Sequence, residues 1–329
     1  MNTKRLVVGA MVLSLALPLQ AEEEQPQQRV QTVADVLEQP GVLTPRGMFV
    51  LDTAFSYAQN SSNRVSVVGY TVLPTLIVGR IEVSDADRTT VTVGLTGRYG
   101  ITNRLEMEVR VPWVYRNDSI AVRPIQDGAP TTEITDLKGS DLGDVELALR
   151  YQFNMQEPPY WVGGVRVKSN TGTSPYDIEV DPDTNEATDV PSGSGFWSVE
   201  PNISMIYPTD PAVIYLNFGY LYNIEDNVTV GDNSVDIRLG DTISLSAGMG
   251  FSVNQDFSFS LGLSHKTILK SHVDGETQNG AKLLQLDTIN FGANYRINPR
   301  TSLNISAQAG LTDDAPDFQL GIRVPFSFQ

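Results

Sequence analysis

The sequence contains no cysteine and only two histidines, His265 and His272. Without cysteine the chain has no disulfide framework and no thiolate metal site, and two histidines by themselves form no strong metal-binding pattern. Basic residues are scarce as well, because 23 Lys and Arg stand against 39 Asp and Glu, for a formal net charge of −16. That balance excludes the basic surface of a nucleic-acid-binding protein. We therefore expect no cofactor, no metal ion and no nucleic-acid partner.

Long hydrophobic runs are missing after the first 20 residues, which excludes a multi-helix membrane protein, whose helices need about 20 apolar residues each. The N-terminus itself carries Lys4 and Arg5, an apolar stretch over 6–17 and a cleavage site at Leu19-Gln20-Ala21. This order is typical of a secretory signal peptide, and an N-terminal membrane anchor is the alternative. We predict that residues 1–21 are the signal peptide and that the protein is exported.

The rest of the chain alternates apolar and polar residues with a period of two. Over 105–115, Leu, Met, Val, Val, Trp and Tyr occupy one parity, and Glu106, Glu108 and Arg110 occupy the other. Successive side chains of a β-strand point to opposite faces, so this pattern predicts a strand with one apolar face. Twelve such stretches occur, at 49–57, 91–99, 105–115, 145–153, 163–167, 197–207, 214–222, 243–253, 257–263, 289–295, 303–309 and 318–328.

The connections between these stretches differ in length in a regular way. Short turns such as 101–103 and 254–256 alternate with long connections at about 59–87, 116–143, 170–195, 224–240 and 268–282, and only the short connection at 312–315 breaks this rule. Short turns on one rim and long loops on the other are the arrangement of outer-membrane barrels. We predict an all-β fold, a 12-stranded antiparallel transmembrane β-barrel over 47–329, in the outer membrane among its lipid. A secreted β-sandwich or a periplasmic lectin is the alternative.

The polar parity of the strands carries many charges, which the barrel would turn toward its lumen. Asp52, Lys266, Arg296 and Asp317 share this parity, and we expect pairs such as Arg98 with Glu106 or Glu108 to offset one another. The residues predicted to line the lumen are Arg98, Glu106, Glu108, Arg110, Asp144, Glu146, Arg150, Arg166, Lys168, Glu200 and Arg323. A wall with balanced charge suits a polar, weakly selective conduit.

Two polar residues fall on the apolar parity instead. Asp287 shares its parity with Ile289 and would face lipid, so we expect a bulge after Leu286 or a position above the membrane. His265 also points outward, and spacing identifies no acid that would orient it. Because a hydrolase needs such an orienting group beside its base, we predict that the chain is not an enzyme.

A segment over 22–46 precedes the first strand. Within it, residues 29–39 (RVQTVADVLEQ) place Val30, Val33, Val36 and Leu37 at helical spacing, and Pro40 ends the pattern. Twelve tilted strands enclose a lumen roughly 12–14 Å wide, which admits one helix of about 10–12 Å diameter. We predict a short plug helix in the barrel mouth, with Val33, Val36 and Leu37 as the gate. A short periplasmic helix and a disordered tail are the alternatives.

The long connection at 170–195 is strongly acidic. Its carboxylates are Asp177, Glu179, Asp181, Asp183, Glu186 and Asp189. The spacing does not fit a calcium loop, because the sixth position is Glu186 rather than Gly. We interpret the segment as a solvated loop, and the alternative is a rim that holds divalent cations bridging to lipopolysaccharide.

Several short motifs resemble a known family. Gly41-Val-Leu-Thr-Pro-Arg-Gly47, Arg98-Tyr-Gly-Ile-Thr-Asn-Arg104, Val111-Pro-Trp-Val-Tyr-Arg116 and Tyr207-Pro-Thr-Asp-Pro211 are similar to the functional-amyloid (Fap) secretion pore of pseudomonads. More loosely, the chain resembles the barrels labelled "MetA-pathway of phenol degradation". The Fap resemblance implies a trimer of helix-plugged, twelve-stranded barrels that export unfolded amyloid subunits. Unlike that pore, the chain has only 22–28 between signal peptide and helix, which is too short for a coiled coil.

Three functions follow from this interpretation. The first is a helix-gated pore that exports an unfolded, amyloid-type polypeptide. The second is a passive channel for small hydrophobic or aromatic compounds, and the third is a structural or adhesive surface barrel. The sequence leaves the cargo, the direction of transport and the oligomeric state open.

Overall fold

The computed structural model describes residues 43–68, 80–123, 133–179, 188–230, 233–277 and 281–328. The predicted signal peptide and the predicted plug helix, with Val33, Val36 and Leu37, lie outside the described residues. The described residues form strands, turns and loops without a helix, so none of them belongs to a helix that is long and apolar enough to cross a membrane.

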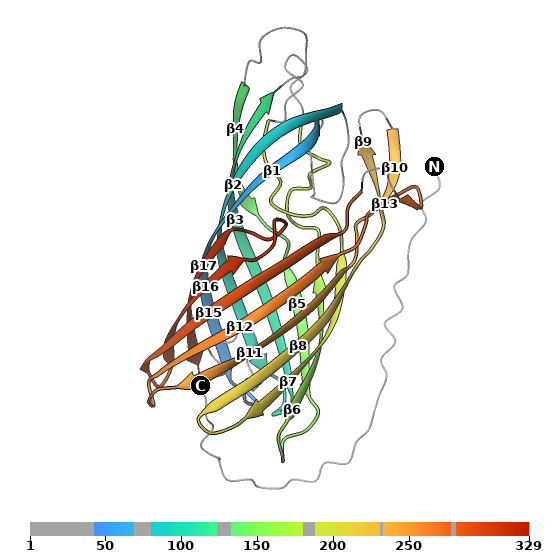
Figure 1. Cartoon of the computed structure of the whole chain (residues 1–329). Coiled ribbons are helices and arrows are strands. Elements are labelled where there is room, and N and C mark those ends of the chain that lie inside the picture. The colour runs from blue at the N-terminus through green and yellow to red at the C-terminus, as the bar shows by residue number, and fades with distance from the viewer. Residues whose placement is uncertain are drawn as a thin grey trace, which may run out of the picture. The chain divides into compact units, whose positions relative to one another are not determined.

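Twelve antiparallel strand positions form one closed barrel (Figure 1). The sheet runs in the order β2-β1-β17-β16-β15-β12-β11-β8-β7-β6-β5-β3, β4 continues the β5 position along β3, and a further pairing of β2 with β3 closes the ring. The strands are β1 Phe49–Val68, β2 Arg80–Gly100, β3 Leu105–Arg123, β4 Glu133–Leu142, β5 Glu146–Gln152, β6 Tyr160–Lys168, β7 Ser198–Pro208, β8 Ala212–Asn223, β11 Thr242–Ser252, β12 Phe257–Ile268, β15 Leu284–Asn298, β16 Thr301–Gly310 and β17 Phe318–Phe328. The predicted 12-stranded antiparallel barrel is confirmed.

The barrel carries its large apolar side chains outside and its polar ones inside. Trp113, Leu263 and Phe291 face outward and are 50%, 56% and 52% exposed, whereas inward-facing Glu106 and Ser258 are fully buried. A soluble protein does the opposite with its large apolar side chains. This inversion is stable only when the outer surface meets hydrocarbon instead of water.

The strands on one side of the barrel are longer than the period-two pattern predicted. The connections at 59–87 and 116–143 were expected to be loops, but β1 continues to Val68, β2 begins at Arg80, and β3 reaches Arg123. The β1–β2 ladder is continuous from Phe49↔Tyr99 to Val68↔Arg80. The outer part of this hairpin is rich in Ser, Asn and Asp, so it lacks the apolar alternation by which strands were recognised.

A second, four-stranded sheet forms within connections that were also predicted to be loops. It contains β9 Asp226–Val230, β10 Asn233–Arg238, β13 His272–Val273 and β14 Glu276–Thr277. Figure 1 shows β9, β10 and β13 at the same end of the barrel as β4. Phe196, Ile237 and Leu239 form a buried apolar cluster here, with Tyr176 packed against it. The sheet and the connection over 169–197 therefore share a small core of their own.

The wall is interrupted between β4 and β5. Leu142 pairs with Trp113 and Leu147 pairs with Val109, so one side has an extra residue and the ladder bulges. Pro112 stands opposite the break and cannot donate a ladder hydrogen bond, but its carbonyl accepts the Gly143 N–H at 2.8 Å. The connection over 169–197 docks at this gap.

Candidate functional site

One half of the lumen wall is charged, and Asp52 on β1 is the centre of its first cluster. The Asp52 carboxylate accepts hydrogen bonds from Nη2 of Arg98 at 3.2 Å and from Nε of Arg323 at 3.0 Å. Asp52 is 2% exposed and Arg98 is 7% exposed. Three neighbouring strands, β17, β1 and β2, are thus joined on the inside of the barrel by one shared carboxylate.

The second charged cluster joins β3 to β5. Arg150 donates Nη1 to Glu106 at 3.0 Å and to Glu108 at 2.8 Å. The expected pairing of Arg98 with Glu106 or Glu108 is therefore wrong, although Arg98 lies directly opposite Glu108 in the ladder. Both glutamates pair instead with Arg150 on β5, on the other side of β3, and Arg98 pairs with Asp52.

The third cluster covers β5, β6 and β7. Arg166 donates Nε to Glu200 at 2.9 Å and Nη1 to Glu146 at 3.2 Å. Of the residues predicted to line the lumen, Arg110 makes no ion pair with any described residue; its Nε lies near Gly94. The charges on this half of the wall are thus largely neutralised within the wall, as balanced cross-strand pairs are in a sheet.

Asp144 anchors the connection over 169–197 to the barrel. Its Oδ2 accepts hydrogen bonds from Nζ of Lys168 at 2.7 Å and from the N–H of Ser194 at 2.9 Å. Its Oδ1 accepts a hydrogen bond from the N–H of Gly172 at 3.1 Å. A Cβ at Gly139, on the inner face of β4, would overlap the carboxylate of Asp189. The described parts of the connection therefore lie against the inner face of the wall.

This connection also buries a tyrosine hydroxyl. The Tyr176 ring meets Phe196 edge-on, with ring centroids 5.8 Å apart. Its hydroxyl is buried and has no hydrogen-bond partner among the described residues. Because burial disfavours the phenolate, the pKa of Tyr176 is raised well above its usual value.

The other half of the wall, over β8, β11, β12, β15 and β16, presents mostly short neutral side chains, with Tyr215, Lys266 and Arg296 as larger or charged exceptions. Its inward residues are Ser, Asn and Gly along much of each strand, as the ladders show. They include Asn217, Ser244, Ser246, Gly248, Ser258, Ser260, Gly262, Ser264, Asn290, Gly292, Asn294, Ser302, Asn304 and Ser306. Sequence reasoning missed this surface because it singled out charges. The signal was present as Ser, Asn and Gly alternating with apolar residues over 244–264 and 290–306.

Residues 43–47 run along the inside of the wall next to the short-turn rim. Leu43, 2% exposed, packs against Val162 and Ile206. Thr44 donates its N–H to Glu106 Oε2 at 2.7 Å, and a Cβ at Gly100 would overlap the carbonyl oxygens of Thr44 and Pro45. The chain entering β1 is therefore seated in the lumen.

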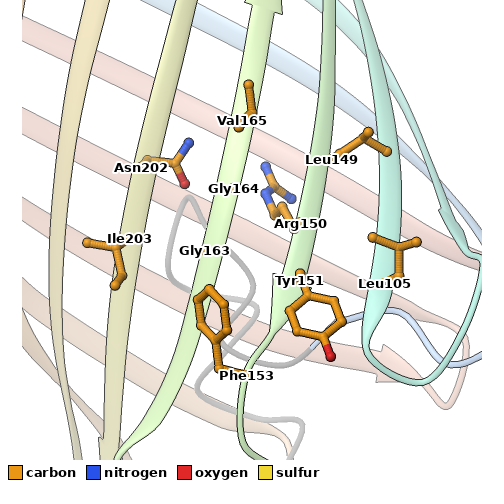
Figure 2. Close-up of a pocket in the computed structure, with 10 residues that line it drawn as sticks. All are labelled: Leu105, Leu149, Arg150, Tyr151, Phe153, Gly163, Gly164, Val165, Asn202 and Ile203. Carbon is orange, nitrogen blue, oxygen red and sulfur yellow. The ribbon is translucent and has the colours of Figure 1, made fainter. Parts of the chain in front are cut away.

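A shallow depression of about 420 Å³ lies over β5, β6 and β7 (Figure 2). Gly163 and Gly164 leave both faces of β6 without side chains there, and the Phe153 ring lies close over Gly163. Leu149 and Val165 border it on the outer face, while Arg150 and Asn202 belong to the inner face.

The outward pair that sequence analysis could not explain forms a contact. His265 Nδ1 lies 2.5 Å from Asp287 Oδ1, and His265 Nε2 lies 2.9 Å from Thr267 Oγ1. The bulge expected after Leu286 is wrong, because the β12–β15 ladder runs unbroken through His265↔Asp287. The acid partner of His265 was missed because it lies 22 residues away on the next barrel strand. No nucleophile pattern accompanies this pair among the described residues.

The acidic connection is only partly described. Asp177, Glu179 and Asp189 lie in the described part of the chain, and Asp181, Asp183 and Glu186 lie outside it. The described residues contain no group of three or more His, Asp or Glu side chains that could hold a metal ion. The contact with lipopolysaccharide through divalent cations stays a prediction.

Comparison with known proteins supports a channel fold. A family model described as "Putative MetA-pathway of phenol degradation" matches residues 124–328. The crystal structure of the COG4313 outer membrane channel from Pseudomonas putida F1 is similar, with a TM-score of 0.61 at 14% identity over 88% of this chain and 98% of that one.

Two further barrels match with TM-scores too low to support an inference. The CymD monoaromatic hydrocarbon channel has a TM-score of 0.42 at 11% identity, over 86% of this chain and 88% of that one. The Ralstonia pickettii toluene transporter TbuX has a TM-score of 0.43 at 8% identity, over 92% of each chain.

Proposed function

Because the chain belongs to the family described as "Putative MetA-pathway of phenol degradation", we propose that this outer-membrane β-barrel is a passive channel for small aromatic compounds. Phenols are the representative solutes, in keeping with the family's description. The protein shares its fold with an outer membrane channel, which supports transport rather than enzymatic chemistry. This is the second of the functions that the sequence predicted.

The two-sided lumen carries the proposal. On one half, Asp52, Glu106 and Glu200 are each paired with arginines, so the wall offers little uncompensated charge to attract an ion strongly. On the other half, serine and asparagine offer neutral hydrogen-bonding groups, and the Tyr215 hydroxyl, which lies over Gly248 and Gly262, adds another. A ring with a hydroxyl group can slide along such a surface and exchange one neutral partner for the next.

The seated segment over 43–47 gives the channel a resting state. Leu43 and Thr44 occupy the lumen near the short-turn rim, and solute must pass beside or displace them. The plug helix predicted over 29–39, with Val33, Val36 and Leu37, would extend the same obstruction. Gating by the N-terminal segment is therefore part of the proposal.

Export of an unfolded polypeptide is the second candidate, and the same segment favours it. Residues 43–45 lie in the lumen as irregular chain, with Leu43 next to Val162 and Ile206. A lumen that holds one such segment has the width for another in its place. The resemblance to the Fap pore supports this candidate, and the homotrimer that it implies stays a prediction, as does the adhesive barrel.

Uptake by whole cells tests the channel. Initial uptake of radiolabelled phenol at low micromolar concentration would be compared between the wild type, a strain without the gene, and two tryptophan variants. Ser246→Trp places an indole in the lumen, whereas Ala247→Trp places it on the outer face one residue later. We expect the deletion and Ser246→Trp to lower uptake and Ala247→Trp to leave it unchanged.

Equal phenol uptake by all four strains would contradict the channel proposal. The same strains, stained for surface fibres and assayed for secreted polypeptide, test the second candidate. Loss of a secreted polypeptide in the deletion strain, with phenol uptake unchanged, would replace the first function by the second.

A further inference from the structure

Asn304 on β16 has an unsatisfied amide. Its side chain faces the lumen and the residue is only 7% exposed. Neither Nδ2 nor Oδ1 has a hydrogen-bond partner in the part of the chain that the structure describes. A buried polar group without a partner destabilises the fold, and such groups in native proteins call for an explanation, a functional role among them.

The amide lies in a row of polar side chains at one level of the neutral wall. Ser258, Asn294 and Asn304 pair directly across β12, β15 and β16, and Arg323 on β17 continues the row. Ser258 is fully buried and Asn294 is 1% exposed. All four side chains are inward, so the row is a continuous strip of donors and acceptors on the lumen side.

The row lies across the barrel from the seated N-terminal segment. Leu43 packs against Val162 on β6, and β16 is the sixth strand from β6 in either direction around the ring. A solute that passes the segment on its open side therefore passes the half of the wall that contains Asn304.

The chemistry of the strip selects a neutral hydroxyl. The Asn304 amide offers both a donor and an acceptor, which matches a hydroxyl group that also donates and accepts. The one cation in the row, Arg323, is already engaged by Asp52 at 3.0 Å, so the row itself offers a carboxylate or phosphate no free charge. A hydrocarbon without a polar group would leave the Asn304 amide unsatisfied.

We propose that Asn304, with Asn294 and Ser258 beside it, is a binding subsite for the hydroxyl group of a phenolic solute. The inference rests on the proposed channel function and adds a specificity-determining residue to it. Because the strip is shielded from bulk water, a hydrogen bond made there is stronger than one in solvent. The subsite therefore raises the occupancy of phenols over aromatic hydrocarbons of the same size.

Phenol and toluene form the matched pair of probes, because a methyl group replaces the hydroxyl. Initial uptake of each labelled compound, at concentrations below saturation, would be measured in the wild type, Asn304→Leu, Asn304→Ser and the gene deletion. We expect Asn304→Leu to lower phenol uptake about fivefold, the equivalent of one hydrogen bond, and not to lower toluene uptake. Asn304→Ser, which replaces the amide by a shorter group that can also donate and accept a hydrogen bond, should give phenol uptake between that of the wild type and that of the leucine variant.

Asn290→Leu is the matched control. Asn290 is also an inward amide of the neutral wall, but it already donates Nδ2 to Ser264 Oγ at 2.7 Å. Heat-modifiable migration in detergent gels would verify that each barrel is folded, and Asn304→Ser keeps the test valid if the leucine variant does not fold.

The two proposals fail in different ways. If the wild type takes up neither compound faster than the deletion strain, the channel function is wrong and the subsite falls with it. If the wild type takes up both, but the Asn304 variants change phenol uptake no more than Asn290→Leu does, the subsite is wrong and the channel stands.

Discussion

Glu106 on β3 accepts the backbone N–H of Thr44, 62 residues earlier in the chain, at 2.7 Å. The same carboxylate receives Nη1 of Arg150 at 3.0 Å through its other oxygen. Glu106 is fully buried, so both contacts are shielded from water. One side chain thus ties the segment before β1 to the wall of the barrel.

Glu106→Ala should open the channel. A hydrogen bond to a charged group contributes roughly 1.5–3 kcal/mol, so its loss shifts the segment from seated to released by about tenfold or more. We expect a higher open probability and a larger mean conductance in planar bilayers.

Glu108→Ala is the control for this variant. Glu108 also pairs with Arg150, at 2.8 Å, but none of its observed contacts is to residues 43–47. Removing it should leave gating unchanged. Equal conductance of the Glu106 and Glu108 variants would show that the segment does not control the pore.

Asp52→Ala should destabilise the barrel. Its carboxylate serves both Arg98 and Arg323 in a buried site, and removing one partner of a buried ion pair costs on the order of 3–5 kcal/mol. We expect a lower urea midpoint for unfolding in detergent micelles. Asp256→Ala, in an exposed turn, should not shift the midpoint, and Asp52→Ala/Arg98→Ala should recover part of the loss.

Asp144→Ala should release the connection over 169–197 from the wall. The carboxylate holds Lys168, Ser194 and Gly172, and its loss leaves the N–H groups of Ser194 and Gly172 without this acceptor and Lys168 without its ion pair. We expect faster cleavage within 169–197 by proteinase K, mapped by mass spectrometry, while the barrel strands stay protected. Asp177→Ala, in the same connection, is the control; identical cleavage of both variants would rule out Asp144 as the anchor.

Tyr176→Phe should be neutral or stabilising at pH 8, by up to about 1 kcal/mol, because it removes a buried hydroxyl that has no partner among the described residues. Burial raises the pKa of Tyr176 above its usual 10.0. The unfolded chain therefore ionises first as pH rises through 10, and stability falls. We expect the variant to lose less stability than the wild type between pH 8 and pH 11, measured by thermal unfolding. Tyr99→Phe, on the outer face, should behave as the wild type; if Tyr176→Phe does too, the hydroxyl is not buried in solution.

Much of the barrel was predictable from sequence because its solvent is uniform on each face. Because hydrocarbon lies outside and a polar lumen inside, apolar and polar residues must alternate along each strand. The apolar residues Val109, Val111 and Trp113, each two positions apart, therefore identify their strand. Beyond the membrane both faces meet water and this constraint ends. The outer parts of β1 and β2, and the whole of β9 and β10, were therefore missed.

The candidate site was predicted in its residue types and missed in its partners. The inward parity of Arg98, Glu106 and Arg150 follows from the alternation. Each arginine can reach carboxylates on both neighbouring strands, and the alternation does not say which one it pairs with. Arg98 pairs with Asp52 on β1, although Glu108 lies directly opposite it on β3. The chain belongs to the family described as "Putative MetA-pathway of phenol degradation", and the resemblance to the Fap pore stays a prediction.

The amino-acid sequence alone determined that this chain forms a barrel in the outer membrane, because parity depends only on the order of residues along each strand. The tertiary structure decided what the barrel encloses. Closing the ring brings Thr44 to Glu106, sets a charged half-wall opposite a neutral one, and leaves the Asn304 amide facing the lumen. These relationships join strands that are far apart in sequence, and only the closed ladder fixes their positions.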